Sequence, residues 1–289
     1  MDELASLATV RALLRQYGIR PRKRWGQNFL INPGILEKIV AAAEISPVDT
    51  VVEIGPGIGA LTARLTALAG HVVAVEIDRS LVALLKERFS ACPNLFLVEG
   101  DALKADFDAL VRAAGGTLPY KVVANLPYYV TTPLLTRLLN TNFTVRLLVV
   151  MVQKEVALRL VARPGTKEYG SLSVLAQYRS EAELVTVVSR GSFFPAPAVD
   201  SAVVKLRLRS APPVAVPDEG LFFRVVRAAF GQRRKTLLNA LAGAGLGRGR
   251  QEWEAVLKQA GIDPQRRGET LDLAAFAAIA RVLAEGVKE

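Results

Sequence analysis

The segment Glu53-Ile54-Gly55-Pro56-Gly57-Ile58-Gly59-Ala60 decides the fold, because it joins a strand pattern to a helix pattern. The β-branched run Thr50 to Ile54 leads into it, and Leu61, Leu65 and Leu68 follow at helical spacing. Glycines at such a turn let the backbone approach a ligand closely above the amino terminus of a helix. The segment therefore predicts a strand, a ligand-binding turn and a helix.

The same alternation continues outward from this turn. Further apolar, β-branched runs are separated by amphipathic segments, and they lie at Val72 to Ile77, Leu95 to Val98, Val122 to Ala124 and Leu147 to Val152. Alternating strand and helix signals are typical of βαβ units and a parallel sheet. The later run Val203 to Leu208 alternates apolar and polar residues, which predicts a half-exposed antiparallel strand. We expect an α/β fold.

A proline-rich segment divides the chain. Residues 210–220 contain Pro212, Pro213 and Pro217 without a helical pattern, which indicates a linker. The sequence after this segment is helical in pattern and contains no β-run. We therefore predict an α/β domain with a basic amino-terminal arm over residues 1–209, and a small all-α domain over residues 221–289.

The composition excludes several classes of protein. With 289 residues, 51% apolar and 22% charged, the chain is neither disordered nor a disulfide-stapled miniprotein. A single cysteine and a single histidine exclude an intramolecular disulfide, a Cys-based metal site and a multi-His metal centre. The longest apolar stretch, Leu147 to Val152, is far shorter than the roughly 20 residues that span a bilayer. We expect a cytoplasmic protein without a metal.

The charge is strongly positive. Lys and Arg number 37 against 27 Asp and Glu, a formal net charge of +10. From Arg11 to Leu36 the chain carries six basic residues and no acidic one. This pattern fits a polyanionic partner. It also fits a basic surface that serves solubility alone.

Polar residues follow the expected parallel strands. Glu76 ends the second, 21 residues after Gly55, and could accept hydrogen bonds from ribose hydroxyls. Asp101, in Glu99-Gly100-Asp101-Ala102, could accept from an adenine amino group. Such strand ends form the crevice where open parallel sheets bind ligands. Because the glycine turn also satisfies the dinucleotide fingerprint, NAD enzymes and methyltransferases both remain open.

The fourth strand ends in Asn125-Leu126-Pro127-Tyr128, which suits chemistry on an adenine amine. That amine is a poor nucleophile, because its lone pair is delocalised into the ring. The Asn125 side-chain oxygen and the Leu126 carbonyl could each accept an N–H bond and turn the lone pair toward an electrophile. Pro127 would fix the backbone, and Tyr128 would offer a stacking face.

These motifs together resemble the bacterial small-subunit ribosomal RNA adenine dimethyltransferases, which use S-adenosylmethionine. The resemblance implies a Rossmann-like class I methyltransferase with a helical carboxy-terminal domain. The motifs that carry it lie in order at Arg22 to Leu30, Glu53 to Thr62, Val75 to Asp78, Glu99 to Ala102, Asn125 to Leu134, Val152 to Leu160, Tyr169 to Val174, Phe193 to Val203 and Phe230 to Leu241.

The resemblance also implies roles for single residues. It places S-adenosylmethionine against Gln27, Asn28, Leu30, Gly55, Gly57, Glu76, Asp101, Ala102 and Asn125. It assigns catalysis to Asn125, Leu126, Pro127, Tyr128 and Phe193. In this last group Phe193 would stack on the target base, with Phe194 as the alternate. Phosphate contacts are expected from Arg22, Lys23, Arg24, Arg233, Arg234 and Lys235, which cluster at both ends of the motif set.

The family transfers methyl groups to two adjacent adenines in a hairpin near the 3′ end of small-subunit ribosomal RNA. We therefore expect in-line methyl transfer to adenine N6 by a monomer that acts on this RNA or on a small-subunit precursor during ribosome biogenesis. Two other functions remain open: an NAD-dependent oxidoreductase, and an RNA-binding assembly or transcription factor that keeps the fold without turnover.

Overall fold

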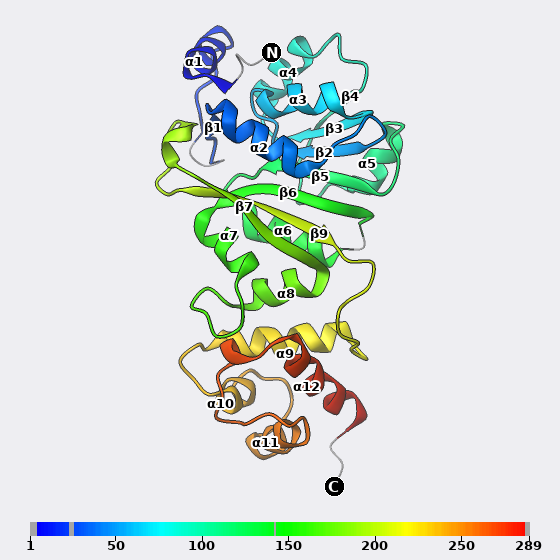
Figure 1. The fold of residues 1–289 in the computed structure, drawn as a ribbon, viewed down its shortest axis with the longest axis vertical. Coiled ribbons are helices and arrows are strands. Elements are labelled where there is room, and N and C mark those ends of the chain that lie inside the picture. The colour runs from blue at the N-terminus through cyan, green and yellow to red at the C-terminus, as the bar shows by residue number, and fades with distance from the viewer. Residues whose placement is uncertain (1–4, 23–25, 142, 287–289) are drawn as a thin grey trace. The chain divides into compact units, whose positions relative to one another are not determined.

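A computed structural model describes residues 5–22, 26–141 and 143–286 (Figure 1). The chain divides into two compact units. Residues 1–157 and 182–208 form the first unit, and residues 158–181 and 209–289 form the second. Within the described ranges, no helix is both long enough and apolar enough to cross a membrane.

A seven-stranded sheet organises the first unit, with the strand order β4-β3-β2-β5-β6-β9-β7. Its strands are β2 (Thr50–Ile54), β3 (His71–Glu76), β4 (Leu95–Glu99), β5 (Tyr120–Asn125), β6 (Val145–Gln153), β7 (Ser180–Val188) and β9 (Ser201–Leu208). The pairs from β4 through to β6 are parallel, and β9 runs antiparallel to β6. The predicted parallel sheet and antiparallel last strand are therefore confirmed.

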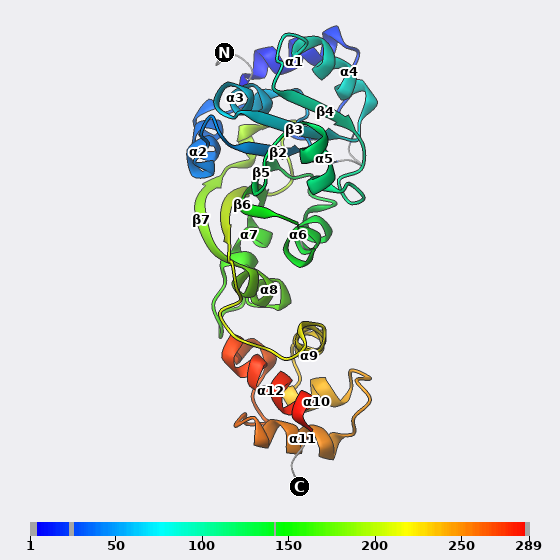
Figure 2. The same ribbon diagram turned by 90° about the vertical axis from the view of Figure 1, so that its right-hand side faces the viewer.

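Helices cover both faces of this sheet (Figure 2). On one face lie α2 (Pro33–Ala43), α3 (Ala60–Leu68) and, at the β4 edge, α4 (Arg79–Arg88), which packs against Leu97 of β4. On the other face lie α5 (Phe107–Ala113) and α6 (Thr131–Asn140). Every residue of β2 is buried, as expected for a parallel strand covered on both faces. In β9 the alternation expected from the sequence is present from Val204 on, because Val204 and Leu206 are buried whereas Arg207 is exposed. β9 lies between β6 and β7.

Shorter elements complete the first unit. They are α1 (Leu7–Gln16), β1 (Phe29–Leu30), the 3₁₀ turn η3 (Arg190–Ser192) and β8 (Phe193–Phe194). The boundary between the two units falls inside α7 (Lys154–Val161), after Ala157. β1 and β8 pair antiparallel, with Phe29 opposite Phe194 and Leu30 opposite Phe193. This small ladder joins the amino-terminal segment to the loop that precedes β9.

The second unit is helical. It contains α8 (Ser171–Arg179), α9 (Glu219–Gly231), α10 (Leu237–Ala242), α11 (Arg250–Gln259), the 3₁₀ turn η4 (Gly268–Thr270) and α12 (Leu273–Glu285). Tyr169, Val174 and Tyr178 belong to the same buried cluster as Phe222 of α9 and Phe276 of α12. That apolar packing explains why residues 158–181 group with this unit, although the sequence placed them in the first domain.

The start of α9 also differs from the expected linker. Asp218 caps this helix by accepting a hydrogen bond from the backbone N–H of Leu221, so the helix begins at Glu219. The predicted linker 210–220 therefore includes the first two residues of a helix. An acid just before an apolar helical pattern is the usual signal of such a start.

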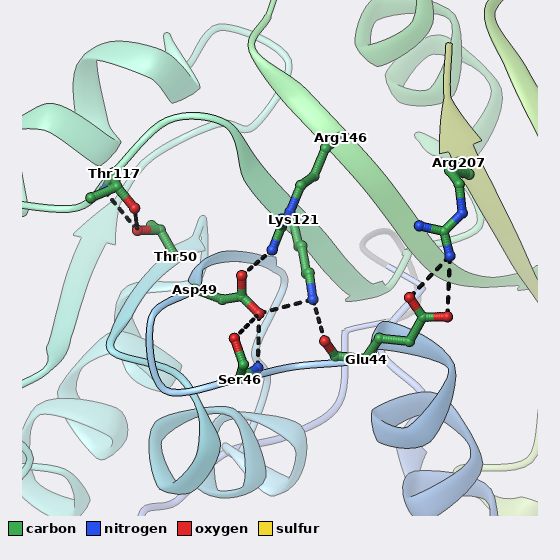
Figure 3. Close-up of polar contacts among 8 residues, drawn as sticks. All are labelled: Glu44, Ser46, Asp49, Thr50, Thr117, Lys121, Arg146 and Arg207. Carbon is green, nitrogen blue, oxygen red and sulfur yellow. Dashed lines mark hydrogen bonds and ion pairs between the residues drawn. The ribbon is translucent and has the colours of Figure 1, made fainter. Parts of the chain in front are cut away.

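A buried ion cluster lies at the amino ends of the parallel strands (Figure 3). Asp49 precedes β2, Lys121 is the second residue of β5, and Arg146 is the second residue of β6. Asp49 accepts bonds from Lys121 at 2.9 Å, from the Ser46 hydroxyl at 2.9 Å and from Arg146. Burial raises the pKa of the Asp49 carboxyl, but the bonds from Lys121 and Ser46 outweigh it and hold that pKa low.

Candidate functional site

A pocket opens at the carboxyl ends of the parallel strands, the opposite end of the sheet from the ion cluster. Four strand-end turns and the segment Gly26 to Leu30 line it, all of them in the first unit. The structure brings into this pocket every residue expected to bind the cofactor, namely Gln27, Asn28, Leu30, Gly55, Gly57, Glu76, Asp101, Ala102 and Asn125. Residues that lie far apart in the sequence thus form one site.

The turn after β2 needs glycine. Gly57 has a φ of +61° and Gly59 a φ of +88°, in the left-handed region that residues with side chains rarely adopt. A Cβ on Gly59 would lie 2.5 Å from the Phe89 ring, and a Cβ on Gly57 would lie 3.3 Å from the Phe29 ring. Glycine therefore lets this turn pack in close contact with the Phe29 and Phe89 rings.

Glu76 is held by backbone groups. Its Oε2 accepts a hydrogen bond from the Gly57 N–H at 3.2 Å, and its Oε1 accepts one from the Asp78 N–H at 2.9 Å. Burial raises the pKa of this carboxyl, and the two N–H groups oppose that rise. A carboxylate offers about four acceptor positions, so Glu76 retains capacity for the hydroxyls of a ligand.

Glu53 is a pocket residue that the sequence analysis did not single out. It is 1% exposed and accepts a hydrogen bond from the Thr62 hydroxyl at 2.6 Å. Burial raises its pKa to about 8, so the carboxyl is mostly protonated at neutral pH. An acid inside an otherwise apolar strand was the signal that could have identified it.

The turn after β5 leaves two acceptor oxygens available. Asn125 Nδ2 donates to the Asn28 carbonyl at 3.3 Å, which leaves the Asn125 Oδ1 atom to accept. The Leu126 N–H donates to the Met151 carbonyl at 3.0 Å, whereas no donor within the described ranges occupies the Leu126 carbonyl. The Pro127 carbonyl accepts bonds from the Val130 N–H and the Thr131 hydroxyl, which fixes the turn.

Two tyrosines follow this turn and line the pocket. The Tyr128 hydroxyl lies 2.6 Å from Ser201 Oγ, and burial raises its pKa. Tyr129, which the sequence analysis did not consider, is 48% exposed. Burial and the nearby carboxylates of Asp101 and Glu76 raise the pKa of Tyr129. Tyr129 thus offers a second aromatic ring beside the predicted one.

The structure does not bring Phe193 into this lining. Phe193 is 3% exposed and belongs to the apolar core that includes Leu30 and Ile35, whereas Phe194 is partly exposed. Because successive strand residues point to opposite faces, only one of this pair can face the core. The Arg11 guanidinium lies over the Phe194 ring, 5.1 Å from its centroid. As it stands, Phe193 has no free face for a base.

The expected phosphate-binding residues differ in their surroundings. Lys23 and Arg24 lie outside the described residues. Arg22 Nε is 3.9 Å from Asp78 Oδ2. Arg233 donates to the carbonyls of Lys167 and Tyr169, and its Nε is 3.6 Å from Glu269. Arg234 and Lys235 are exposed between α9 and α10 and have no ion pair within the described part of the chain.

Proteins of similar sequence belong to the family that the motifs indicated. The sequence pattern of the family described as ribosomal RNA adenine dimethylase matches residues 18–281. A protein of Pelotomaculum thermopropionicum named ribosomal RNA small subunit methyltransferase A is 58% identical over 286 residues, 97% of each chain. A protein of the same name from Geobacillus kaustophilus is 50% identical over 285 residues, 98% of this chain and 97% of that one.

Two solved structures are similar over most of the chain. A dimethyladenosine transferase from Plasmodium falciparum has a TM-score of 0.74 at 29% identity, covering 89% of this chain and 98% of its own. The 23S rRNA methyltransferase ErmE has a TM-score of 0.66 at 27% identity, covering 89% of this chain and all of its own. The expected class I methyltransferase fold is therefore confirmed.

Proposed function

The chain belongs to the ribosomal RNA adenine dimethylase family, and on this basis we propose that it methylates adenine N6 in small-subunit ribosomal RNA. The methyl donor is S-adenosylmethionine. The target is a pair of adjacent adenines in the hairpin near the 3′ end of that RNA, each of which receives two methyl groups. The protein acts as a monomer without a metal ion, in the bacterial cytoplasm where ribosomal subunits are assembled.

One observation supports this proposal most directly: two free acceptors, Asn125 Oδ1 and the Leu126 carbonyl, occur at consecutive residues beside a pocket with cofactor-binding features. An adenine amine has two N–H bonds to donate. Two acceptors at one turn suit that group, whereas hydride transfer to or from a nicotinamide requires no such pair.

The residues of the pocket fit S-adenosylmethionine. Gly57 contributes only backbone to the pocket lining, and Glu76 has acceptor capacity left for the ribose hydroxyls. Asp101 and Ala102 follow β4 in the lining and suit the adenine part. When bound, the cofactor supplies a methyl group carried on a positively charged sulfur.

The chain contributes orientation rather than a strong base. Asn125 Oδ1 and the Leu126 carbonyl accept the two N–H bonds of the target amine, which directs its lone pair away from the ring plane. The bonds to the Pro127 carbonyl hold the turn in place, so these acceptors need not reorganise during the reaction. The Tyr128 ring supports the base by stacking, with the hydroxyl anchored to Ser201.

Mass spectrometry of unmethylated small-subunit RNA, incubated with the protein and isotope-labelled S-adenosylmethionine, tests the function. We expect two labelled methyl groups on each of two adjacent adenines. Asn125→Ala should abolish this labelling while RNA binding persists. Unchanged labelling in that variant would remove the proposed acceptor role of Asn125.

The same protein distinguishes the two other functions. An NAD-dependent oxidoreductase would bind NAD but not S-adenosylmethionine in a calorimeter. An assembly factor without turnover would bind small-subunit RNA and label none of it. Either result would replace the proposed methyl transfer.

A further inference from the structure

Asp78 connects the pocket to the segment Gly26 to Leu30, although it stands outside the described lining. Its side chain is 2% exposed. Its Oδ1 caps α4 by accepting a hydrogen bond from the Ser80 N–H at 3.0 Å. Its Oδ2 accepts a hydrogen bond from Gln27 Nε2 at 2.9 Å. The two oxygens thus have separate tasks: one caps a helix, and the other holds Gln27.

Gln27 is bound at both ends of its amide. Its Nε2 donates to Asp78, and its Oε1 accepts a hydrogen bond from the Arg22 backbone N–H at 2.7 Å. The Arg22 Nε atom is itself 3.9 Å from Asp78 Oδ2. Hydrogen bonds to an ionised, desolvated carboxylate are stronger than neutral ones. Asp78 is therefore the anchor of this part of the amino-terminal segment.

The backbone of Asp78 contacts the opposite wall of the pocket. Its N–H donates to Glu76 Oε1 at 2.9 Å, and Glu76 Oε2 accepts from the Gly57 N–H. One residue thus links Gln27 on the amino-terminal segment with Glu76 and the glycine turn. These are the residues between which the cofactor of the proposed function would lie.

We propose that Asp78 is a positioning residue for cofactor binding: through Gln27 it keeps the segment Gly26 to Leu30 in the conformation that lines the pocket. The inference rests on the proposed function for the identity of the cofactor. If the bond to Asp78 is removed, the lining conformation is populated for a fraction of the time, and the apparent dissociation constant rises by the inverse of that fraction. Loss of a hydrogen bond to a charged group should raise that dissociation constant roughly tenfold or more.

Asp78→Asn is the decisive variant. The Asn side-chain oxygen can still cap α4, but the amide nitrogen that replaces Oδ2 cannot accept from Gln27. Calorimetry with S-adenosylmethionine should show about tenfold weaker binding, and kcat at saturating cofactor should stay near that of the unchanged protein. A role confined to the stability of α4 would leave the dissociation constant unchanged.

Asp106→Asn is the matched control. Asp106 caps α5 through the Ala109 N–H and has no part in the pocket, so cofactor binding should not change. Gln27→Met removes the donor to Asp78 and leaves the Asp78 cap of α4 intact. Because Gln27 also lines the pocket, its loss is interpreted through the double variant. The double variant Gln27→Met/Asp78→Asn should bind no more weakly than the weaker of the two single variants.

Normal cofactor binding by Asp78→Asn, or fully additive losses in the double variant, would overturn the role of Asp78. Failure of the unchanged protein to bind S-adenosylmethionine would instead overturn the proposed function. The two results are distinguishable because the first requires measurable binding by the unchanged protein.

Discussion

The Lys121 ammonium lies 2.9 Å from Asp49 Oδ2, with only 6% and 5% of the two side chains exposed. Lys121 also donates to the Glu44 carbonyl, and Arg146 reaches the other oxygen of Asp49 (Figure 3). Removing one partner of such a pair leaves a buried charge without compensation, which costs more than the pair contributes.

Lys121→Met should therefore destabilise the fold. We expect the free energy of unfolding to fall by about 3 kcal/mol, the lower end of the range for buried pairs, since Arg146 still contacts Asp49. Urea denaturation at neutral pH measures this decrease in the free energy of unfolding. In the control Arg207→Ala, which alters a half-exposed pair with Glu44, the decrease should stay below about 1 kcal/mol. Equal decreases in the two variants would contradict the importance of burial.

Glu53→Gln should change how stability depends on pH. The folded-state pKa of Glu53 is about 8 against an ordinary value of 4.5, so the folded protein binds a proton that the unfolded chain has released. The free energy of unfolding of the unchanged protein should fall as the pH rises from 4.5 to 8, because the buried carboxyl must then ionise. Glutamine mimics the protonated acid and can still accept from Thr62.

Denaturation without cofactor at pH 5 and pH 9 measures this effect. We expect a shallower pH dependence for Glu53→Gln and greater stability than the unchanged protein at pH 9. An equally steep decrease in both proteins would show that Glu53 is not the titrating group.

Tyr128 allows the ring to be separated from its hydroxyl. Tyr128→Phe removes the bond to Ser201, so the free energy of unfolding should fall by about 1 kcal/mol while methyl transfer continues. Tyr128→Ala also removes the stacking face, which is worth about 1–3 kcal/mol per base, so steady-state methylation should fall by about five- to 150-fold. A Phe variant as inactive as the Ala variant would assign the role to the hydroxyl instead.

Arg234 and Lys235 should contribute to RNA binding more than Arg233. Replacing Arg234 and Lys235 with Ala should weaken binding to small-subunit RNA. The slope of log affinity against log salt should also become shallower, by roughly one unit for each phosphate that the variant no longer neutralises. Arg233→Ala should mainly destabilise the second unit, because its guanidinium donates to two backbone carbonyls there. Filter binding over a salt series, with thermal denaturation alongside, separates these effects.

Much of the site could be predicted because strand-end residues lie at one edge of a parallel sheet. The glycine turn, Glu76, Asp101 and Asn125 each lie at or just after the carboxyl end of a strand, so the order of motifs indicated that they are neighbours. The segment Gly26 to Leu30 is different, because its place depends on pairing with β8, more than 160 residues later. Only the family resemblance pointed to it.

Other features depend on burial, which a motif does not reveal. Phe193 and Phe194 are chemically alike, and the pleat of β8 decides which of them faces the core. In the sequence, Asp78 is simply the last residue of the motif Val75 to Asp78, and the structure was needed to show that it accepts a hydrogen bond from Gln27. In the sequence, Arg233 is indistinguishable from its basic neighbours, whereas in the structure it donates hydrogen bonds to the carbonyls of Lys167 and Tyr169.

The helical unit draws its interior from two separate stretches of the chain. A fragment that ends at residue 209 would keep Tyr169, Val174 and Tyr178 but lose Phe222 and Phe276, against which they are buried. Its exposed apolar side chains should make this fragment aggregate. A fragment that contains the first unit alone would instead have to lack both stretches of the second unit. Residues 158–181 would be deleted as well, and a short loop would connect residue 157 to residue 182.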